Sequence, residues 1–260
     1  MLLDGKVALI TGGAQGLGKA FAEELLKQKV KVCICDVKQE TGEKTIDEWK
    51  PKYDNRAIFV KCDVSNLTEF EEAFKQATAK FGGLDIVVNN AGLSGENVIS
   101  WRTIVIVNLI GVIEGTKLAE KYLNKQSGGR GGVVVNIGST AGLTPIPYAP
   151  AYAASKYGVV GYTRSVALKP DTGPSGLRYV CLCPAFTYTS MFSEVQQAMA
   201  VPGHESLSKV VQDTGINKIE DVVEAFMQLL LTDDNNGGVM IISKKGGIQY
   251  HGRRRKVNKL

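Results

Sequence analysis

Short apolar runs of five to seven residues alternate along the chain with longer segments in which apolar positions recur every three or four residues. The runs span residues 6 to 11, 30 to 35, 57 to 62, 84 to 88, 132 to 137, 177 to 183 and 238 to 243. Such runs are typical of strands buried on both faces, and the intervening period is typical of amphipathic helices. The alternation predicts an α/β fold built on a doubly wound, parallel, seven-stranded sheet.

A glycine-rich turn follows the first apolar run. Residues 6 to 19 read Lys-Val-Ala-Leu-Ile-Thr-Gly-Gly-Ala-Gln-Gly-Leu-Gly-Lys, so Gly12, Gly16 and Gly18 stand between a predicted strand and a predicted helix. Glycine allows a tight turn and a close approach to a pyrophosphate, whose charge is met by amide groups at the helix N-terminus. An ordinary strand-to-helix turn is the alternative, because the spacing differs from the general dinucleotide fingerprint.

A carboxylate closes the second apolar run and favours the dinucleotide interpretation. Asp36 follows residues 30 to 35, at the distance where a carboxylate meets the ribose hydroxyls of adenosine. The same carboxylate would repel a 2′-phosphate, and the next residues are Val37 and Lys38 rather than arginine. The sequence therefore favours NAD over NADP, and Lys38 leaves the phosphorylated cofactor open.

Small and polar residues also follow the next two runs. Asp63-Val64 comes after residues 57 to 62, and Asn89-Asn90-Ala91-Gly92 ends the run from 84 to 88. Ligands of parallel α/β sheets bind outside the carboxyl ends of the strands, so we expect these segments to border the same ligand. Polar strand ends without a ligand are the alternative.

A tyrosine and a lysine four residues apart carry the candidate chemistry. In Tyr152-Ala-Ala-Ser-Lys156 the two side chains share one helix face, and Ser139 lies thirteen residues upstream. An ammonium beside a phenol lowers the phenol's pKa from about 10 toward neutrality, so Tyr152 is a candidate proton donor or acceptor. Ser139 is expected to orient a hydroxyl or carbonyl against it. Taken alone, the pair also fits a solvated helix face.

Together these residues resemble those of the classical short-chain dehydrogenases/reductases, from about Lys6 to Ile248. The resemblance implies a Rossmann-type sheet in one domain over residues 1 to 250, with a substrate lid at about 185 to 215 and a basic tail at 251 to 260. The motifs that carry it, in the family's order and spacing, are Thr11-Gly12-x-x-x-Gly16-x-Gly18, Asn89-Asn90-Ala91-Gly92, Asn108, Ser139, Tyr152-x-x-x-Lys156 and Pro184.

The resemblance implies a catalytic tetrad of Asn108, Ser139, Tyr152 and Lys156, which transfers a hydride between a secondary alcohol carbon and C4 of a nicotinamide. Tyr152 would remove the alcohol proton, Lys156 would lower the Tyr152 pKa and bind the nicotinamide ribose, and Ser139 would bond the substrate oxygen. Asn108 would hold a water that relays the proton outward. It equally fits a structural residue that kinks its apolar helix.

The resemblance also implies an NAD site at the strand ends. Its expected residues are Gly12, Gln15, Gly16, Leu17, Gly18, Asp36, Val37, Cys62, Asp63, Val64, Asn90, Ala91, Gly92, Tyr152, Lys156, Pro184, Thr187 and Thr189. Where the family commonly has Pro-Gly, this chain has Pro184-Ala185, and alanine is small enough that we expect the cofactor to fit. A non-catalytic dinucleotide-binding protein is the alternative, and the complete tetrad argues against it.

Apolar residues after Pro184 indicate a pocket for a lipid-like alcohol or ketone. Phe192, Val195 and Met199 fall at i, i+3 and i+7 on one helical face, although core packing is the commoner meaning of such a stripe. Oxidised fatty acids, prostaglandins, steroids, retinoids and isoprenoid alcohols stay open as substrates. The expected substrate residues are Ser139, Tyr148, Ala149, Tyr152, Phe186, Tyr188 and Phe192.

Within the family, the glycine turn and two further segments most resemble members that oxidise 15-hydroxyprostaglandins with NAD. Those segments are Phe21-Ala22-Glu23 and Gly161-Tyr-Thr-Arg-Ser165. The same members carry a glutamine three residues before the catalytic tyrosine, where it is thought to contact the reacting oxygen. Ala149 stands there in this chain, so either Tyr148 supplies a hydroxyl or the substrate is not a prostaglandin.

Charge and cysteine usage narrow the partners. The net charge of +5 equals the five basic residues between 253 and 259, so the rest of the chain is balanced. A basic terminal tail is not a basic folded face, and no nucleic-acid partner is expected.

All five cysteines lie in predicted strands without a metal-binding spacing, which indicates buried thiols and no metal site. Free thiols also indicate a reducing compartment, taken as the cytoplasm. The terminal Asn258-Lys259-Leu260 has a faint resemblance to a peroxisomal address.

Two expectations concern the environment of the folded chain. No stretch is apolar enough to span a membrane. The family resemblance also implies a two-fold homodimer through the helices from about 103 to 124 and from 152 to 168.

Overall fold

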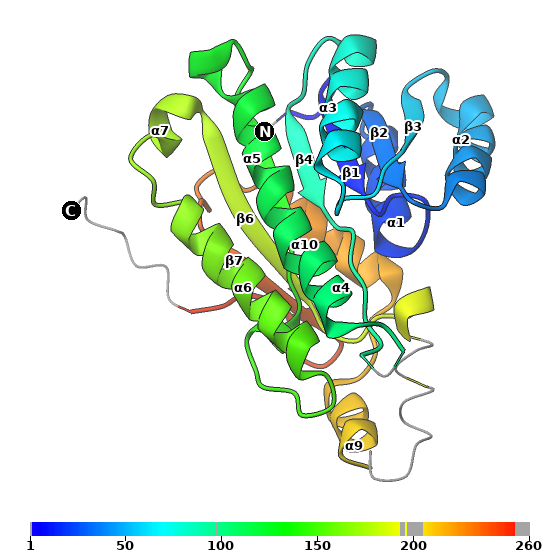
Figure 1. Cartoon of the computed structure of the whole chain (residues 1–260), viewed down its shortest axis with the longest axis vertical. Coiled ribbons are helices and arrows are strands. Elements are labelled where there is room, and N and C mark those ends of the chain that lie inside the picture. The colour runs from blue at the N-terminus through cyan, green and yellow to red at the C-terminus, as the bar shows by residue number, and fades with distance from the viewer. Residues whose placement is uncertain (1, 97, 193–195, 197–204, 253–260) are drawn as a thin grey trace.

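The computed structural model describes residues 2–96, 98–192, 196 and 205–252, which form one sheet with helices on both faces (Figure 1). The strand order is β3-β2-β1-β4-β5-β6-β7-β8, and every neighbouring pair from β3 to β7 is parallel. From β1 the chain adds β2 and β3 on one side and then β4 to β7 on the other, so the strand order reverses between β1 and β4. Doubly wound sheets bind ligands at this point. The strands are β1 (Val7–Thr11), β2 (Lys31–Asp36), β3 (Ala57–Lys61), β4 (Ile86–Asn89), β5 (Gly132–Ile137), β6 (Leu177–Pro184), β7 (Val239–Ser243) and β8 (Gly247–Tyr250).

The expected parallel, doubly wound sheet is confirmed, and it carries one strand that the sequence did not predict. Strand β8 pairs antiparallel with β7 at the edge of the sheet, with Ser243 opposite Gly247. Its four residues alternate between exposed and half-buried, so they form no apolar run. A short hairpin strand at a sheet edge needs only one apolar face, so β8 lacks the continuous apolar run that marks a strand buried on both faces.

Two helical layers cover the sheet. Helices α1, α2 and α10 pack on one face, and α3, α5 and α6 pack on the other, where α5 and α6 cross the front of Figure 1. The helical segments are α1 (Gly16–Lys27), α2 (Gln39–Tyr53), α3 (Leu67–Phe81), α4 (Trp101–Val105), a π-helix (Ile106–Ile110), α5 (Gly111–Leu123), 3-10 turns (Lys125–Ser127 and Thr140–Gly142), α6 (Pro150–Val166), α7 (Thr172–Ser175), α9 (Glu205–Thr214) and α10 (Ile219–Leu231).

Strand β1 shows how the sheet divides the core. Ala8 and Ile10 belong to the apolar cluster under α1 and α10, while Val7 and Leu9 belong to the cluster under α3 and α5. All four are completely buried, as alternation on a strand between two helical layers requires. Phe21 of α1 stacks on Phe226 of α10 with ring centroids 4.4 Å apart. This packing fixes α1, and with it the turn that precedes α1.

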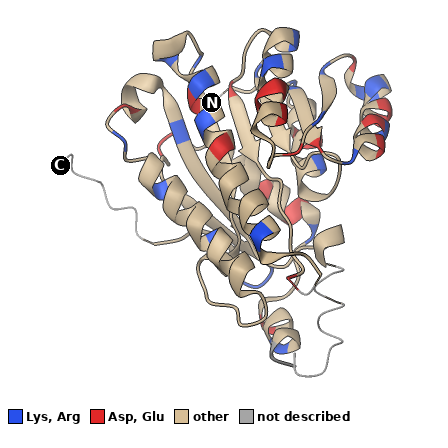
Figure 2. Cartoon of the chain, viewed as in Figure 1, with Lys and Arg blue, Asp and Glu red and all other residues tan. Residues whose placement is uncertain are grey.

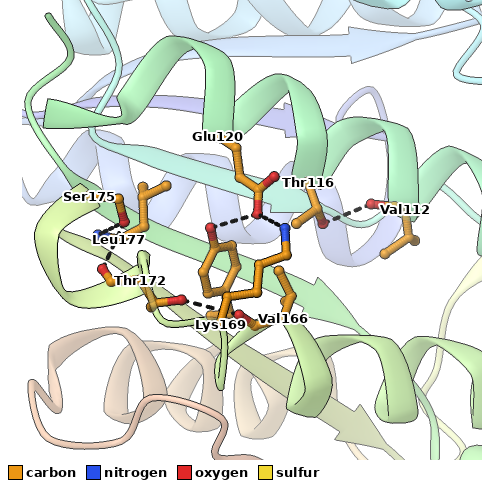
Figure 3. Close-up of polar contacts among 9 residues, drawn as sticks. Val112, Thr116, Glu120, Val166, Lys169, Thr172, Ser175 and Leu177 are labelled. Atoms are coloured by element: carbon orange, nitrogen blue, oxygen red, sulfur yellow. Dashed lines mark hydrogen bonds and ion pairs between the residues drawn. The ribbon is translucent and has the colours of Figure 1, made fainter. Parts of the chain in front are cut away.

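One polar cluster joins α5 and α6 to β6 at the end of the sheet where β6 begins (Figure 3). Glu120 of α5 accepts hydrogen bonds from the Lys169 ammonium at 2.8 Å and from the Tyr179 hydroxyl of β6 at 3.1 Å. Burial, followed by the Glu120 carboxylate, raises the pKa of Tyr179, which keeps its phenol protonated as a donor. Thr172 and Ser175 hold the short α7 turn that leads into β6.

Acidic and basic residues are mixed on the outer helices, as Figure 2 shows for α2 and α3. The helices of the described ranges include none with the length and apolar character that a bilayer crossing requires.

Candidate active site

Side chains would clash at Gly12, before α1, and at Gly18, in its first turn. Gly12 has a φ of +62°, and a Cβ on it would lie 2.9 Å from the Cα of Ala91. A Cβ on Gly18 would lie 2.2 Å from the carbonyl oxygen of Gly12. Both positions therefore need glycine, for backbone conformation and for close packing. The backbone from Gly12 to Gly18 is called here the glycine cradle; at Gly16 within it, a Cβ would meet only Thr189, at 3.9 Å.

Strand β4 holds this turn from the other side. The Asn90 amide donates to the carbonyls of Thr11 at 2.9 Å and Gly12 at 3.1 Å. The Thr11 hydroxyl in turn accepts from the backbone amides of Asn90 and Ala91, each at 3.0 Å. The glycine turn and the segment after β4, which are far apart in sequence, therefore form one rigid unit.

The N-terminus of α1 suits an anionic ligand. Gln15 occupies the cap position and its side chain makes no capping hydrogen bond, so the first amides of the helix are not satisfied by a side chain there. Uncapped amides and the positive end of the helix dipole favour a phosphate group. Leu17 packs beside the core from this turn, and Thr189 approaches it, with its Cγ2 3.9 Å from where a Gly16 Cβ would stand.

Asp36 lies beside the cradle with its carboxylate fixed. One oxygen accepts from the Ala14 amide at 3.1 Å and the other from the Lys38 amide at 3.0 Å. Asp36 is only 8% exposed, so its carboxylate is largely buried at the end of β2. The Lys38 ammonium points to Gln15, whose amide oxygen it contacts at 3.2 Å. The carboxylate and the glycine cradle together fit the adenosine half of a dinucleotide.

The remaining expected cofactor residues line the ends of β2, β3 and β4. The Cys62 amide donates to the Asp36 carbonyl at 3.0 Å, and burial raises the pKa of the Cys62 thiol to about 12. Asp63 turns away into its own loop, where it accepts from the Ser65 hydroxyl at 2.7 Å. Val64 is buried against the segment around Gly111, and Val37 is exposed.

The tyrosine and the lysine lie on α6 as their spacing predicts. The Lys156 Nζ is 5.8 Å from the centroid of the Tyr152 ring and donates to the carbonyl of Ile137 at 2.9 Å. Ser139 caps the 3-10 turn that follows β5, where its hydroxyl accepts from the Ala141 amide at 3.1 Å. The same hydroxyl lies 3.5 Å from the carbonyl of Pro184 and hydrogen-bonds the Tyr152 side chain. Three expected catalytic groups thus converge from β5 and α6.

Burial sets the direction of both catalytic pKa values. It raises the pKa of Tyr152, and the hydrogen bond from Ser139 works against it. It lowers the pKa of Lys156 to about 8. The sequence predicted instead that Lys156 lowers the Tyr152 pKa toward neutrality, and that prediction is wrong for this arrangement. Burial of the phenol outweighs the hydrogen bond from Ser139, and the Lys156 ammonium is itself buried and bonded to the carbonyl of Ile137.

Asn108 lies in the π-helix between α4 and α5, completely buried. Its amide oxygen accepts from the Leu93 amide at 2.7 Å, and its Nδ2 donates to the Leu93 carbonyl at 2.9 Å and to Ser155 at 3.3 Å. The expected helix distortion is therefore present as a π-turn, a feature often found at functional sites. A Cβ on Gly92 would be 3.4 Å from the Asn108 oxygen and 3.7 Å from the Lys156 nitrogen, so these groups meet at one point.

The expected substrate residues surround a small apolar cluster. Phe192 is buried with Leu207 and Val211 of α9, and Tyr148 and Phe186 pack against this group. The ring centroids of Tyr188 and Phe192 are 5.7 Å apart, although Tyr188 is more than half exposed. Val195 and Met199, the other members of the predicted stripe, lie outside the described residues. Thr187 bonds its own loop, donating to the carbonyl of Ala185 at 2.9 Å.

Tyr148 and Ala149 precede the catalytic helix directly. Burial, and then the charge of a Tyr152 phenolate, raise the pKa of Tyr148 to about 12, so its hydroxyl remains a hydrogen-bond donor. Ala149 occupies the cap position of α6 and provides no capping side chain. The two phenols lie close enough to interact, and the three residues between them in sequence, Ala149, Pro150 and Ala151, carry no polar side chain.

Two further residues organise the site: sequence reasoning named Thr11 only as part of the glycine motif and gave it no role, and it missed Glu96. Thr11 holds the backbone after β4, and the only signal for it was its place directly before Gly12. The carboxylate of Glu96 accepts a hydrogen bond from the backbone amide of Tyr152 at 2.6 Å. No local pattern marks Glu96, because its partner is 56 residues away along the chain.

Comparison with known proteins places the chain among dehydrogenases. Residues 6–200 match the short chain dehydrogenase family. The chain is 42% identical over 201 residues to 15-hydroxyprostaglandin dehydrogenase (NAD+) of Rattus norvegicus, covering 76% of this chain and 74% of that protein. It is 35% identical over 199 residues to 3beta-hydroxysteroid dehydrogenase 2 of Eggerthella lenta, covering 73% and 74%. The crystal structure of levodione reductase superposes with a TM-score of 0.81 at 29% identity, over 94% of this chain and 98% of that one.

Proposed function

Because the chain belongs to the short chain dehydrogenase family, we propose that it is an NAD-dependent oxidoreductase that interconverts a secondary alcohol and a ketone on an apolar, lipid-like substrate. The observation that carries the proposal is the meeting of Ser139, Tyr152 and Lys156 beside the glycine cradle. A protein that only bound a dinucleotide would gain nothing from a lysine buried at some cost beside a tyrosine.

The described residues suit NAD. The uncapped start of α1 would hold the pyrophosphate, Asp36 the ribose hydroxyls of the adenosine half, and Lys156 the ribose next to the nicotinamide. The bound cofactor would supply a hydride acceptor for alcohol oxidation. Asp36 needs little rearrangement for its part, because two backbone amides already fix its carboxylate.

The chain's own residues would handle the proton. The Tyr152 oxygen accepts the proton of the alcohol as the carbon loses its hydride, and Ser139 donates a hydrogen bond to the same substrate oxygen. Burial lowers the pKa of Lys156 to about 8, so its ammonium is mostly charged at neutral pH and would be available to donate a hydrogen bond to the ribose next to the nicotinamide. Asn108 fixes the loop after β4 by its hydrogen bonds to Leu93, which supports a structural role for Asn108. This role is compatible with holding a water that relays the proton outward.

The substrate side of the site favours an apolar compound. Phe186, Phe192 and Tyr148 belong to one apolar cluster, and Tyr148 lies close enough to Tyr152 to be affected by a charge on it. The two relatives named above act on a hydroxyprostaglandin and a hydroxysteroid according to their names. A 15-hydroxyprostaglandin or a related hydroxylated fatty acid is the first candidate, and a steroid, retinoid or isoprenoid alcohol is the alternative.

The test is NADH formation from NAD across a panel of these alcohols. We expect at least one apolar secondary alcohol to be oxidised efficiently and short aliphatic alcohols to be poor substrates. A protein that binds NAD with normal affinity but oxidises no member of the panel would instead support the non-catalytic alternative.

We expect Ala149→Gln to raise kcat/KM for a 15-hydroxyprostaglandin more than for a simple aliphatic alcohol. A glutamine there offers a donor to the reacting oxygen, and one net hydrogen bond is worth about 1 kcal/mol, or roughly fivefold in rate. Steady-state rates on both substrates measure the effect. Tyr148→Phe is the parallel variant, because the Tyr148 hydroxyl is the other available donor; an enzyme efficient on prostaglandins and insensitive to both changes would contradict the idea.

We propose that the protein is a homodimer through the helices from about 103 to 124, which comprise the end of α4, the π-helix and α5, and through α6. Trp101, Ile106, Ile110 and Tyr157 are each more than 40% exposed, an unusual apolar group on neighbouring helices. We expect Ile110→Asp to shift the mass measured by light scattering at micromolar concentration from dimer to monomer. The control Leu67→Asp alters an equally exposed apolar residue on α3 and should leave a dimer. A wild-type protein that is monomeric under these conditions would refute the proposal.

A cytoplasmic location is part of the same proposal. All five cysteines are free and buried, and the sulfurs of Cys33 and Cys35 are 3.9 Å apart without a bond. Free thiols in this number suit a reducing compartment.

A further inference from the structure

The catalytic helix α6 begins without a cap of its own. Its cap position is Ala149, which has no side-chain acceptor, and its first residue is Pro150, which has no N–H. The amides of the first turn after Pro150 therefore need acceptors from outside the helix. The Tyr152 amide finds one in the carboxylate of Glu96, at 2.6 Å. This bond is charge-assisted and lies at the positive end of the helix dipole.

Glu96 belongs to the segment that follows β4, and that segment is anchored at three points. Asn90 bonds the glycine turn, Leu93 is bonded through both its backbone groups to Asn108, and Glu96 bonds the amide of Tyr152. The turn at Gly95, which has a φ of +83°, accepts the amides of Val98 and Ile99 and presents Glu96 toward α6. Seven residues thus connect the cofactor cradle to the residue expected to move the proton.

We propose that Glu96 is a positioning residue for Tyr152: its carboxylate caps the catalytic helix from the loop after β4 and fixes the backbone that carries the phenol. The inference rests on the proposed function for the meaning of Tyr152, but the cap itself does not. Lys156 lies one turn further on and has its own anchor at the carbonyl of Ile137. Loss of Glu96 should therefore disturb Tyr152 and leave the cofactor contact of Lys156 in place.

Two variants of Glu96 separate its charge from its hydrogen bond. Glu96→Ala removes the acceptor, and Glu96→Gln keeps an acceptor oxygen of the same reach without the charge. We expect Glu96→Ala to lower kcat by roughly tenfold, because a misplaced reacting group costs rate even when binding survives. We expect its NAD dissociation constant to stay within about twofold of the wild-type value, and Glu96→Gln to recover most of kcat.

Asn66→Ala provides a matched control for a purely structural cap. Asn66 caps α3 by accepting from the amides of Thr68 and Glu69, on a helix that carries no site residue. Both alanine variants should lower Tm by a similar amount, and only Glu96→Ala should lower kcat. Equal kcat for the two variants, or a loss in Glu96→Ala confined to NAD affinity, would overturn the proposal.

Amide hydrogen exchange tests the cap without any assay of turnover. In Glu96→Ala, peptides containing residues 151 to 154 should exchange faster while peptides covering the second half of α6 should not change. Unchanged exchange at Tyr152 would overturn the proposal even in an active enzyme. If Glu96→Ala exchanges faster at these residues but the wild-type protein oxidises no alcohol, the cap is upheld and the proposed function is rejected. The two failures are therefore distinguishable.

Discussion

Tyr152→Phe is expected to abolish turnover while leaving NAD affinity nearly unchanged. The substitution keeps the ring that packs beside Lys156 and removes the single oxygen that can take the substrate proton. Loss of a general acid or base costs on the order of 10² to 10⁴ in rate, so activity should fall to the limit of a steady-state assay. Cofactor titration by fluorescence beside rate measurements separates the two effects.

The control for this prediction lies on the same helix. Tyr162 is a half-buried phenol of α6 whose pKa burial raises to about 12, and Tyr162→Phe removes the same atom away from the site. It should leave kcat intact. Lys156→Ala should reduce both kcat and NAD affinity, because Lys156 is expected to contact the cofactor as well as Tyr152. Full activity in Tyr152→Phe would remove Tyr152 from the mechanism.

Asp36→Ala should narrow the preference for NAD over NADP, and mainly by weakening NAD. Hydrogen bonds to a charged group contribute about 1.5 to 3 kcal/mol, so NAD affinity should fall by roughly ten- to a hundredfold. NADP should lose less, since its 2′-phosphate no longer meets a fixed carboxylate and gains Lys38 as a neighbour. The measurement is kcat/KM for both cofactors with one substrate.

Glu40→Ala is the matched control for charge alone. Glu40 is an exposed acid in the first turn of α2, four residues after Asp36. Its removal changes the net charge by the same amount and should leave the cofactor ratio within about twofold, because exposed charges are screened. If the wild-type enzyme used NADP more efficiently than NAD, Asp36 at the end of β2 would not bind the ribose hydroxyls of the adenosine half as proposed.

The strands and the main site residues were accessible from the sequence because both are encoded locally. A strand buried on both faces is an apolar run wherever it occurs, which is why all seven parallel strands were found and only the half-exposed β8 was not. Gly12, Gly18, Asp36, Tyr152 and Lys156 likewise depend on spacing along one turn or one helix. The structure brings them to the carboxyl ends of the parallel strands, as this topology requires.

What the sequence did not give depends on contacts between distant segments. Glu96 acquires its role only when the loop after β4 meets α6, and no pattern around it specifies that meeting. The pKa direction of Tyr152 depends on how completely the phenol and Lys156 are desolvated, which is a property of the packed site. Spacing located the two groups, and burial decided how they interact.

The π-turn at residues Ile106–Ile110 has the geometry of an α-helix that has gained one residue. Deleting a residue there would replace the widened turn by a regular α-helical turn and change the position of Asn108 within it. Asn108 would then turn away from Leu93 and Ser155, which it now bonds from a fully buried position. The length of this segment is therefore constrained as well as its composition: an insertion or deletion between Ile106 and Ile110 would move Asn108 away from the partners that hold it in the site.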